Sequence, residues 1–145
     1  MRRLVLIATV AAIGVGAAFA QSAAIGQRKD IFKSWGGALR PVGPMLRGEA
    51  PFELAKVQDA VKLIADKAGD VSKLFPADSK EGGETKALPN IWTDNAKFQG
   101  IFTKLAADAK AAQGAIKDEA SFKAEMPKVL GNCGACHNEF RVKAN

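Results

Sequence analysis

Apolar residues recur at every third or fourth position along four segments of the chain, which is the period of an amphipathic helix. No alternating apolar and polar run is bounded by a hairpin turn, so strands are not expected. The four apolar stripes are Ile25, Phe32, Trp35, Leu39 and Val42; Leu54, Val57, Val61, Ile64, Ala68, Val71 and Phe75; Ile91, Phe98, Ile101, Phe102, Leu105, Ala109 and Ala112; and Phe122, Met126, Val129, Cys133, Cys136 and Phe140.

Prolines and glycines mark where the first two helices begin and end. Pro41, Gly43 and Pro44 are expected to distort or end the first helix, because proline lacks a backbone N–H and clashes with the preceding turn. Pro51 suits the first turn of the second helix, which Pro76 stops.

A polar loop is expected over 77–89, followed by the third helix with Asn90 as its N-cap. The fourth helix is expected to begin near Asp118 or Ser121, and Pro127 should kink it or split off its first turn. Each stripe covers only one face, so no helix is stable alone in water. The chain is therefore predicted to be all-α, an antiparallel up-down-up-down four-helix bundle.

The first twenty residues have a different character. Arg2 and Arg3 precede an uncharged run, and Ala-Phe-Ala at 18–20 supplies an A-x-A cleavage site. Residues 1–20 are predicted to be a cleaved signal peptide, which leaves 21–145 as a single domain in the periplasm of a Gram-negative bacterium. The alternative is a membrane anchor, for which the apolar run is slightly short; the mature chain is not expected to associate with a membrane.

Composition limits the chemistry available to the chain. One histidine, two cysteines and no tyrosine exclude a site with two imidazoles, a dense disulfide scaffold and tyrosine catalysis. No nucleophile–base pair or paired carboxylates stand out, so an enzyme is not expected. The charge is +6, or +4 without the leader, and it comes from scattered lysines, so nucleic-acid binding is not expected.

The chemistry concentrates in Cys133-Gly-Ala-Cys136-His137, a C-x-x-C-H motif. In an exported protein this motif is the signature of covalent c-type haem attachment. The two thiols lie on one helical turn, close enough to bond the two vinyl groups of one porphyrin, and His137 follows as the proximal iron ligand. One haem c, held through Cys133 and Cys136, is therefore predicted.

Other interpretations of the motif fit the chain less well. A thioredoxin-like redox pair opens a helix in a βαβ unit, whereas this motif lies near the end of a helical chain. A zinc site needs a fourth ligand, and the sequence has no further Cys or His. A structural disulfide leaves the adjacent histidine unexplained. A thiol–disulfide protein without haem stays open as an alternative.

The C-terminal motif is followed by Phe140 and Arg141, and the chain also has a predicted signal peptide and four predicted helices. With these features, the chain resembles the cytochrome c′ family of class II c-type cytochromes. The resemblance covers the whole predicted mature chain. It implies a four-helix bundle that holds haem between its helices near one end, and commonly a homodimer.

The resemblance also implies what lies on the distal face of the haem. In the family, the residue four positions after a basic residue near the start of the first helix points at the iron. Arg28 and Phe32 occupy these positions, whereas low-spin relatives carry methionine at the second. Phe32 has no lone pair, so the match implies five-coordinate, high-spin iron beneath an apolar lid. Phe32 as ordinary bundle core is compatible with this interpretation.

The resemblance places Arg141 near the proximal imidazole, where it shields the pocket or pairs with a haem propionate; a solvated surface arginine is the alternative. Trp35 and Trp92 are expected in the core or the haem wall. Met126 shares the helix of His137, about three turns away, and cannot easily reach the opposite haem face. Met45, a lysine amine or the new N-terminal amine remains a candidate for a sixth ligand.

The predicted function is a periplasmic haem protein that binds diatomic gases, nitric oxide and carbon monoxide by resemblance, or transfers single electrons. The alternative is a six-coordinate, low-spin electron-transfer cytochrome of the same fold. The sequence does not identify a redox partner.

Overall fold

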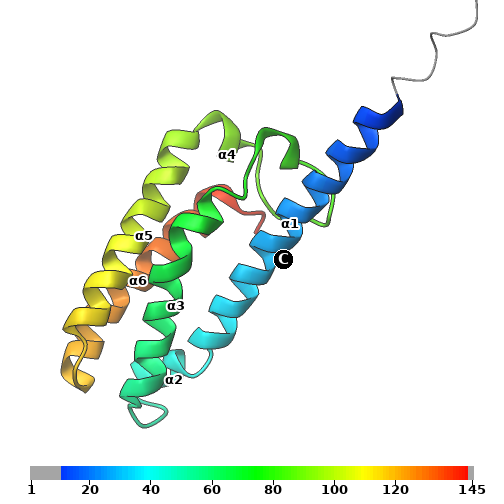
Figure 1. Cartoon of the computed structure of the whole chain (residues 1–145). Coiled ribbons are helices and arrows are strands. Elements are labelled where there is room, and N and C mark those ends of the chain that lie inside the picture. Colours follow the sequence, from blue (N-terminus) through cyan, green and yellow to red (C-terminus); the bar gives the residue numbers. More distant parts are fainter. Residues whose placement is uncertain (1–10, 144–145) are drawn as a thin grey trace, which may run out of the picture.

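A computed structural model describes residues 11–143 (Figure 1). The first ten residues of the predicted signal peptide lie outside the described residues. The elements are α1 (Ala11–Leu39), α2 (Val42–Arg47), α3 (Leu54–Ser72), the 3₁₀ turn η1 (Ala77–Ser79), α4 (Asn90–Thr93), α5 (Asn95–Ala115) and α6 (Glu119–Phe140).

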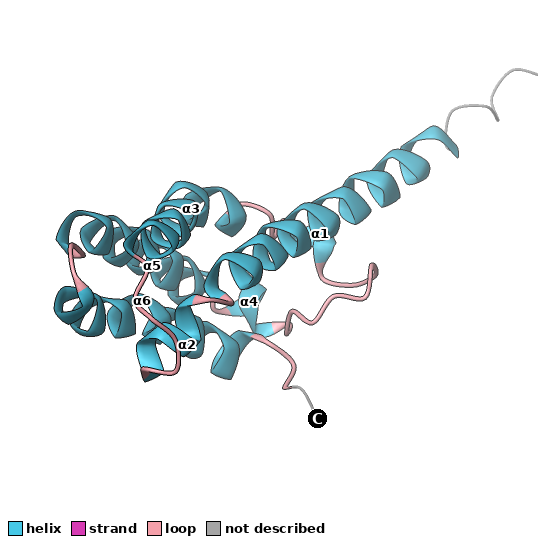
Figure 2. Cartoon of the chain, turned by 90° about the horizontal axis from the view of Figure 1, so that it is seen from below, coloured by secondary structure: helices cyan, strands magenta, loops and turns pink. Residues whose placement is uncertain are grey.

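The four long helices α1, α3, α5 and α6 form the bundle, and each runs antiparallel to the next (Figure 1). This arrangement confirms the predicted all-α four-helix bundle. Figure 2 shows the N-terminal part of α1 extending beyond the other helices. No helix between residues 11 and 143 has the length and apolar character needed to cross a membrane.

α6 begins at Glu119, which agrees with the prediction, and the hydrogen bonds of its N-cap explain why the helix begins there. Asp118 is the N-cap: its carboxylate accepts the Ser121 backbone N–H at 2.8 Å, and the Ser121 hydroxyl accepts the Asp118 N–H at 3.0 Å. This reciprocal pair satisfies two of the backbone donors that every helix start leaves open. Pro127 is predicted to kink the helix or to split off its first turn, and the split does not occur, because α6 continues through this residue.

Three other predicted boundaries need correction. Asn90 is not the N-cap of the third helix: it is the first residue of the short α4, and its side-chain amide donates to the Glu139 carbonyl at 2.9 Å. Val42 belongs to α2 rather than to the first helix. The helix expected to begin at Pro51 begins at Leu54, three residues later.

The packing of the helices is uneven around the bundle. The largest helix–helix interfaces join α3 to α5, α5 to α6 and α1 to α3, whereas α1 and α6 make few direct contacts. The core fills the space against α3 and α5. It includes fully buried residues from three helices: Val61, Ile64, Phe98, Phe122 and Met126. The side of the bundle between α1 and α6 is therefore left open.

The loop after η1 closes against α1 through unusual backbone geometry. Gly82, Gly83 and Glu84 all have positive φ, at 87°, 53° and 52°. A Cβ built on Gly83 would lie 2.9 Å from the Ile25 Cγ2 atom, so only glycine allows this close approach. Beyond this turn, the loop pairs with the residues after α6 through an antiparallel bridge between Ala87 and Arg141.

We predict that Gly83→Ala destabilises the protein by about 1–2 kcal/mol, because an alanine at positive φ is strained and its Cβ meets Ile25. The matched control is Gly100→Ala in α5, where a Cβ meets nothing within 4 Å. That change should stabilise the protein by about 0.5–1 kcal/mol. Denaturant unfolding of both variants measures the difference, and equal effects would contradict the close approach.

Candidate functional site

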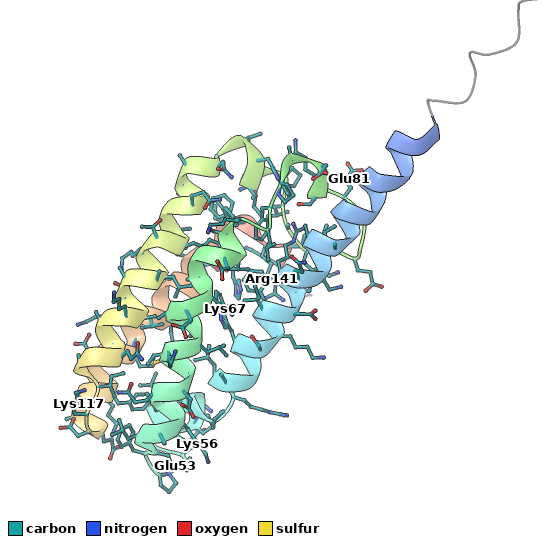
Figure 3. The ribbon with its side chains drawn as sticks, viewed as in Figure 1. Glu53, Lys56, Lys67, Glu81, Lys117 and Arg141 are labelled. Carbon is teal, nitrogen blue, oxygen red and sulfur yellow. The ribbon has the colours of Figure 1, made fainter. Side chains whose placement is uncertain are left out.

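A cavity of about 730 Å³ occupies the open side of the bundle. It is lined by residues of α1, α5 and α6 and by the loop segment 84–87. Its volume lies in the range of about 300–1,000 Å³ that is typical of ligand and cofactor sites. The cavity lies toward Arg141, away from the end of the bundle that carries Glu53, Lys56 and Lys117 (Figure 3).

The structure brings all six sequence-predicted site residues to this one cavity. Two of them, Arg28 and Phe32, come from α1. The others come from α6 and the residue after it: Cys133, Cys136, His137 and Arg141. The α1 residues and the α6 residues are about a hundred positions apart in sequence, so only the antiparallel bundle places them on one cavity.

The spacing of the α6 residues explains why they share the cavity. Cys133, Cys136, His137 and Phe140 recur at intervals of one, three or four residues, so they fall on one helical face. Phe140 is buried and accepts the Leu88 backbone N–H at 3.0 Å. The end of α6 is thus fixed to the loop that forms the neighbouring cavity wall.

Asn132, which sequence reasoning missed, fixes α6 on the other side of the motif. It is 6% exposed, and its amide donates to the Asp108 carboxylate at 2.7 Å and to the Lys128 carbonyl at 3.0 Å. Hydrogen bonds from Lys104 and Asn132 lower the pKa of Asp108, so the carboxylate stays charged. This link joins α5 to α6 directly before Cys133. The available sequence signal was a polar residue three positions after Val129 and directly before Cys133, beside the apolar stripe of the fourth helix.

The two thiols line the cavity, are partly buried and form no disulfide. Burial raises the pKa of Cys133. Burial, then the neighbouring Cys133 and Glu139, raises the pKa of Cys136 to about 11. Both groups therefore remain protonated at neutral pH, and neither has the low pKa of a redox-active thiol.

His137 lies beside the thiols on the same cavity. Desolvation, followed by the positive charge of Arg141, lowers its pKa. The imidazole is therefore held neutral at neutral pH, and a neutral ring nitrogen is what an iron ligand requires.

An aromatic group forms the opposite wall. Phe32 is 36% exposed, and its ring lies edge-on to Trp35 at a centroid distance of 5.6 Å and tilted to Phe102 at 6.5 Å. Phe32 is therefore a cavity-wall residue and not part of the closed core. Trp35 lines the cavity as well, whereas Trp92 is not among the lining residues.

Arg28 has a role that the sequence did not predict. It is 2% exposed, and its Nη1 donates to the Leu74 carbonyl at 2.9 Å and the Ser79 hydroxyl at 2.8 Å. Its Nη2 donates to the Ser79 carbonyl at 3.0 Å and the Thr85 hydroxyl at 2.9 Å. The guanidinium also lies 4.3 Å from the centre of the Phe75 ring. Arg28 thus ties α1 to η1 and to the loop that lines the cavity.

The residues around the cavity fit a c-type haem. The lining is mainly apolar, with side chains such as Leu39, Ile64, Phe98 and Leu105, which suits a porphyrin face. Two protonated thiols and a neutral imidazole meet at one wall. The Trp35 indole N–H is buried without a hydrogen-bond partner.

A four-helix bundle whose cavity wall carries two thiols and an imidazole is typical of the four-helix class of c-type haem proteins. A sequence profile of the cytochrome c′ family matches residues 23–141. Cytochrome c′ of Rhodopseudomonas palustris is 54% identical over 141 residues, which cover 97% of each chain. Cytochrome c-556 of the same organism is 32% identical over 148 residues, which cover 99% of each chain.

A solved structure of cytochrome c′ from Rhodopseudomonas palustris superposes with a TM-score of 0.81 at 56% identity, covering 84% of this chain and 98% of that one. The chain therefore belongs to the cytochrome c′ family, whose members are haem proteins without enzymatic activity and are typically periplasmic. Its cofactor is one haem c, attached covalently through Cys133 and Cys136.

We predict that Arg28→Met destabilises the protein by about 2–4 kcal/mol, because four hydrogen bonds are lost and buried oxygens of Ser79 lose their donors. The matched control is Lys29→Met, since Lys29 makes an exposed hydrogen bond to Gly83 and a 3.9 Å ion pair with Glu84. That change should cost less than about 1 kcal/mol. Denaturant unfolding compares them, and a similar loss in both would contradict the anchoring role.

Proposed function

We propose that the protein holds five-coordinate, high-spin haem iron with His137 as its only protein ligand, and that it binds diatomic gases on the face covered by Phe32. The observation that carries this proposal is the pairing of His137 on one wall of the cavity with an aromatic, non-ligating wall from α1. The 54% identity to a cytochrome c′ over nearly the whole chain supports it.

When bound, the haem supplies an iron centre that takes up small neutral ligands and changes its charge by one electron. Cys133 and Cys136 hold it to α6, so it cannot leave the cavity. His137 presents a neutral nitrogen, and Arg141 places a positive charge beside that imidazole. The rings of Phe32 and Trp35 exclude water and anions while a diatomic molecule needs only a small movement of the wall.

The positions of the methionines do not support the alternative in which a second side chain binds the haem iron. Met45 and Met126 are 2% and 0% exposed in the core, and neither lines the cavity. Lysines do line it, but Lys33 and Lys86 have exposed side chains, and coordination by a charged lysine amine requires loss of its proton.

We also propose that residues 1–20 are removed on export to the periplasm. The family profile begins at residue 23, shortly after the predicted cleavage site. The solved relative is covered over 98% of its length although only 84% of this chain takes part, which is consistent with a shorter mature protein. A homodimer is proposed on the family resemblance, and sedimentation velocity of the haem-loaded protein tests it.

The spectrum of the reduced protein tests the iron coordination. We predict a high-spin spectrum that changes on addition of carbon monoxide, because the rings of Phe32 and Trp35, which α1 contributes to the cavity wall, carry no group that would bind the iron. A sharp low-spin spectrum that carbon monoxide leaves unchanged would favour the six-coordinate alternative.

Phe32→Met is predicted to shift the iron toward low spin, because its thioether can reach the iron if residue 32 faces it. The matched control is Phe52→Met, since Phe52 packs on Phe122 and does not line the cavity. No spectral shift in Phe32→Met, or the same shift in both variants, would remove Phe32 from the distal face.

Intact-mass measurement tests the maturation of the chain. Protein exported by a host with haem-attachment machinery should begin at Gln21 and carry one haem, an added mass on the order of 600 Da. Cys133→Ala/Cys136→Ala should lose this added mass under denaturing conditions. A chain of unchanged mass would support the thiol–disulfide alternative.

A further inference from the structure

Trp35 contacts Phe32 from within the same helix. The two residues are three positions apart on α1, so their side chains lie on neighbouring points of one helical face. Their rings meet edge-to-face, with centroids 5.6 Å apart and planes at 74°. Trp35 is 6% exposed, whereas Phe32 is 36% exposed, so the more exposed ring packs on the more buried one.

The second support of Phe32 is Phe102 on α5, at a centroid distance of 6.5 Å. Phe102 is 3% exposed and is itself packed edge-to-face on Phe98 at 5.0 Å. Phe32 thus contacts one ring of its own helix, Trp35, and one ring of α5, Phe102. The contact with Trp35 is the closer of the two.

The two tryptophans of the chain differ in the hydrogen bonding of their indole N–H groups. Its indole N–H is buried without a partner, and an unpaired buried donor costs free energy. The Trp92 N–H, in contrast, donates to the Phe75 and Pro76 carbonyls, each at 3.0 Å. Among the described residues, the contact of Trp35 with Phe32 is therefore made by its ring and not by its indole N–H.

Gly36 follows Trp35, lies one turn after Phe32 and lines the cavity. It adds no side chain to the wall beside these two rings, so Phe32 and Trp35 are the aromatic residues that α1 contributes there.

We propose that Trp35 is a positioning residue that holds the Phe32 ring in the distal wall and thereby slows the access of diatomic ligands to the haem. The proposal rests on the proposed function, because it assumes that Phe32 covers the face opposite His137. It adds a specific residue to that function: the edge-to-face contact of Trp35 sets how easily the Phe32 ring moves aside.

The test is the association rate of carbon monoxide with the reduced, haem-loaded protein, measured by stopped flow. Trp35→Met removes the ring and should raise the rate about threefold to tenfold, the range expected from one aromatic contact. Trp35→Phe keeps a smaller ring and should give an intermediate increase, and it carries the test alone if Trp35→Met does not fold. The control Trp92→Phe should leave the rate unchanged.

A double-mutant cycle supplies a readout that does not depend on gas binding. Trp35→Met and Phe32→Leu, alone and combined, are unfolded with denaturant in the haem-loaded state. Coupling of about threefold to tenfold in the unfolding equilibrium constant is expected if the two rings support one another. Additive effects would overturn the proposal.

The outcomes separate this proposal from the proposed function. If Phe32→Leu changes the association rate but the Trp35 variants do not, Trp35 has no positioning role and the distal assignment of Phe32 stands. If neither position affects the rate, both the positioning role of Trp35 and the distal role of Phe32 are wrong.

Discussion

The cavity exists because α1 and α6 pack on α3 and α5 rather than on one another. The interfaces of α3 with α5 and of α5 with α6 are the largest in the bundle, and apolar residues of α5 that lie outside them line the cavity. The faces of α1 and α6 that remain are apolar as well, and they face a space of about 730 Å³. A haem that bonds to α6 covers these faces, so the cofactor completes the core that the helices leave open.

The loop after η1 connects the two walls of this cavity. Arg28 binds it to α1 through Ser79 and Thr85, and backbone pairing with Phe140 and Arg141 binds it to the end of α6. The helix that carries the aromatic wall and the helix that carries His137 are therefore joined by one short segment. This segment links the two walls, which make few direct contacts with one another.

The chemistry of the site follows from the different character of its two walls. The α6 wall presents groups that bond: the sulfurs of Cys133 and Cys136, which attach the haem, and an imidazole kept neutral by burial and by Arg141. The α1 wall includes the rings of Phe32 and Trp35, which carry no group that binds iron. In the proposed function, a ligand that approaches from this side passes the contact between the two rings, so their packing controls its access.

The sequence by itself determined the helical period, the start of α6 and the haem-attachment motif, because each depends on residues within a few positions of one another. It did not determine that Asn90 would bind Glu139 instead of capping a helix, nor that Arg28 would anchor a loop some fifty residues away. These contacts depend on the tertiary arrangement, which brings distant backbone acceptors within reach of a side chain. The pairing of Trp35 with Phe32 lies between the two cases: their spacing placed both on one helical face, but only the structure decided that this face borders the cavity.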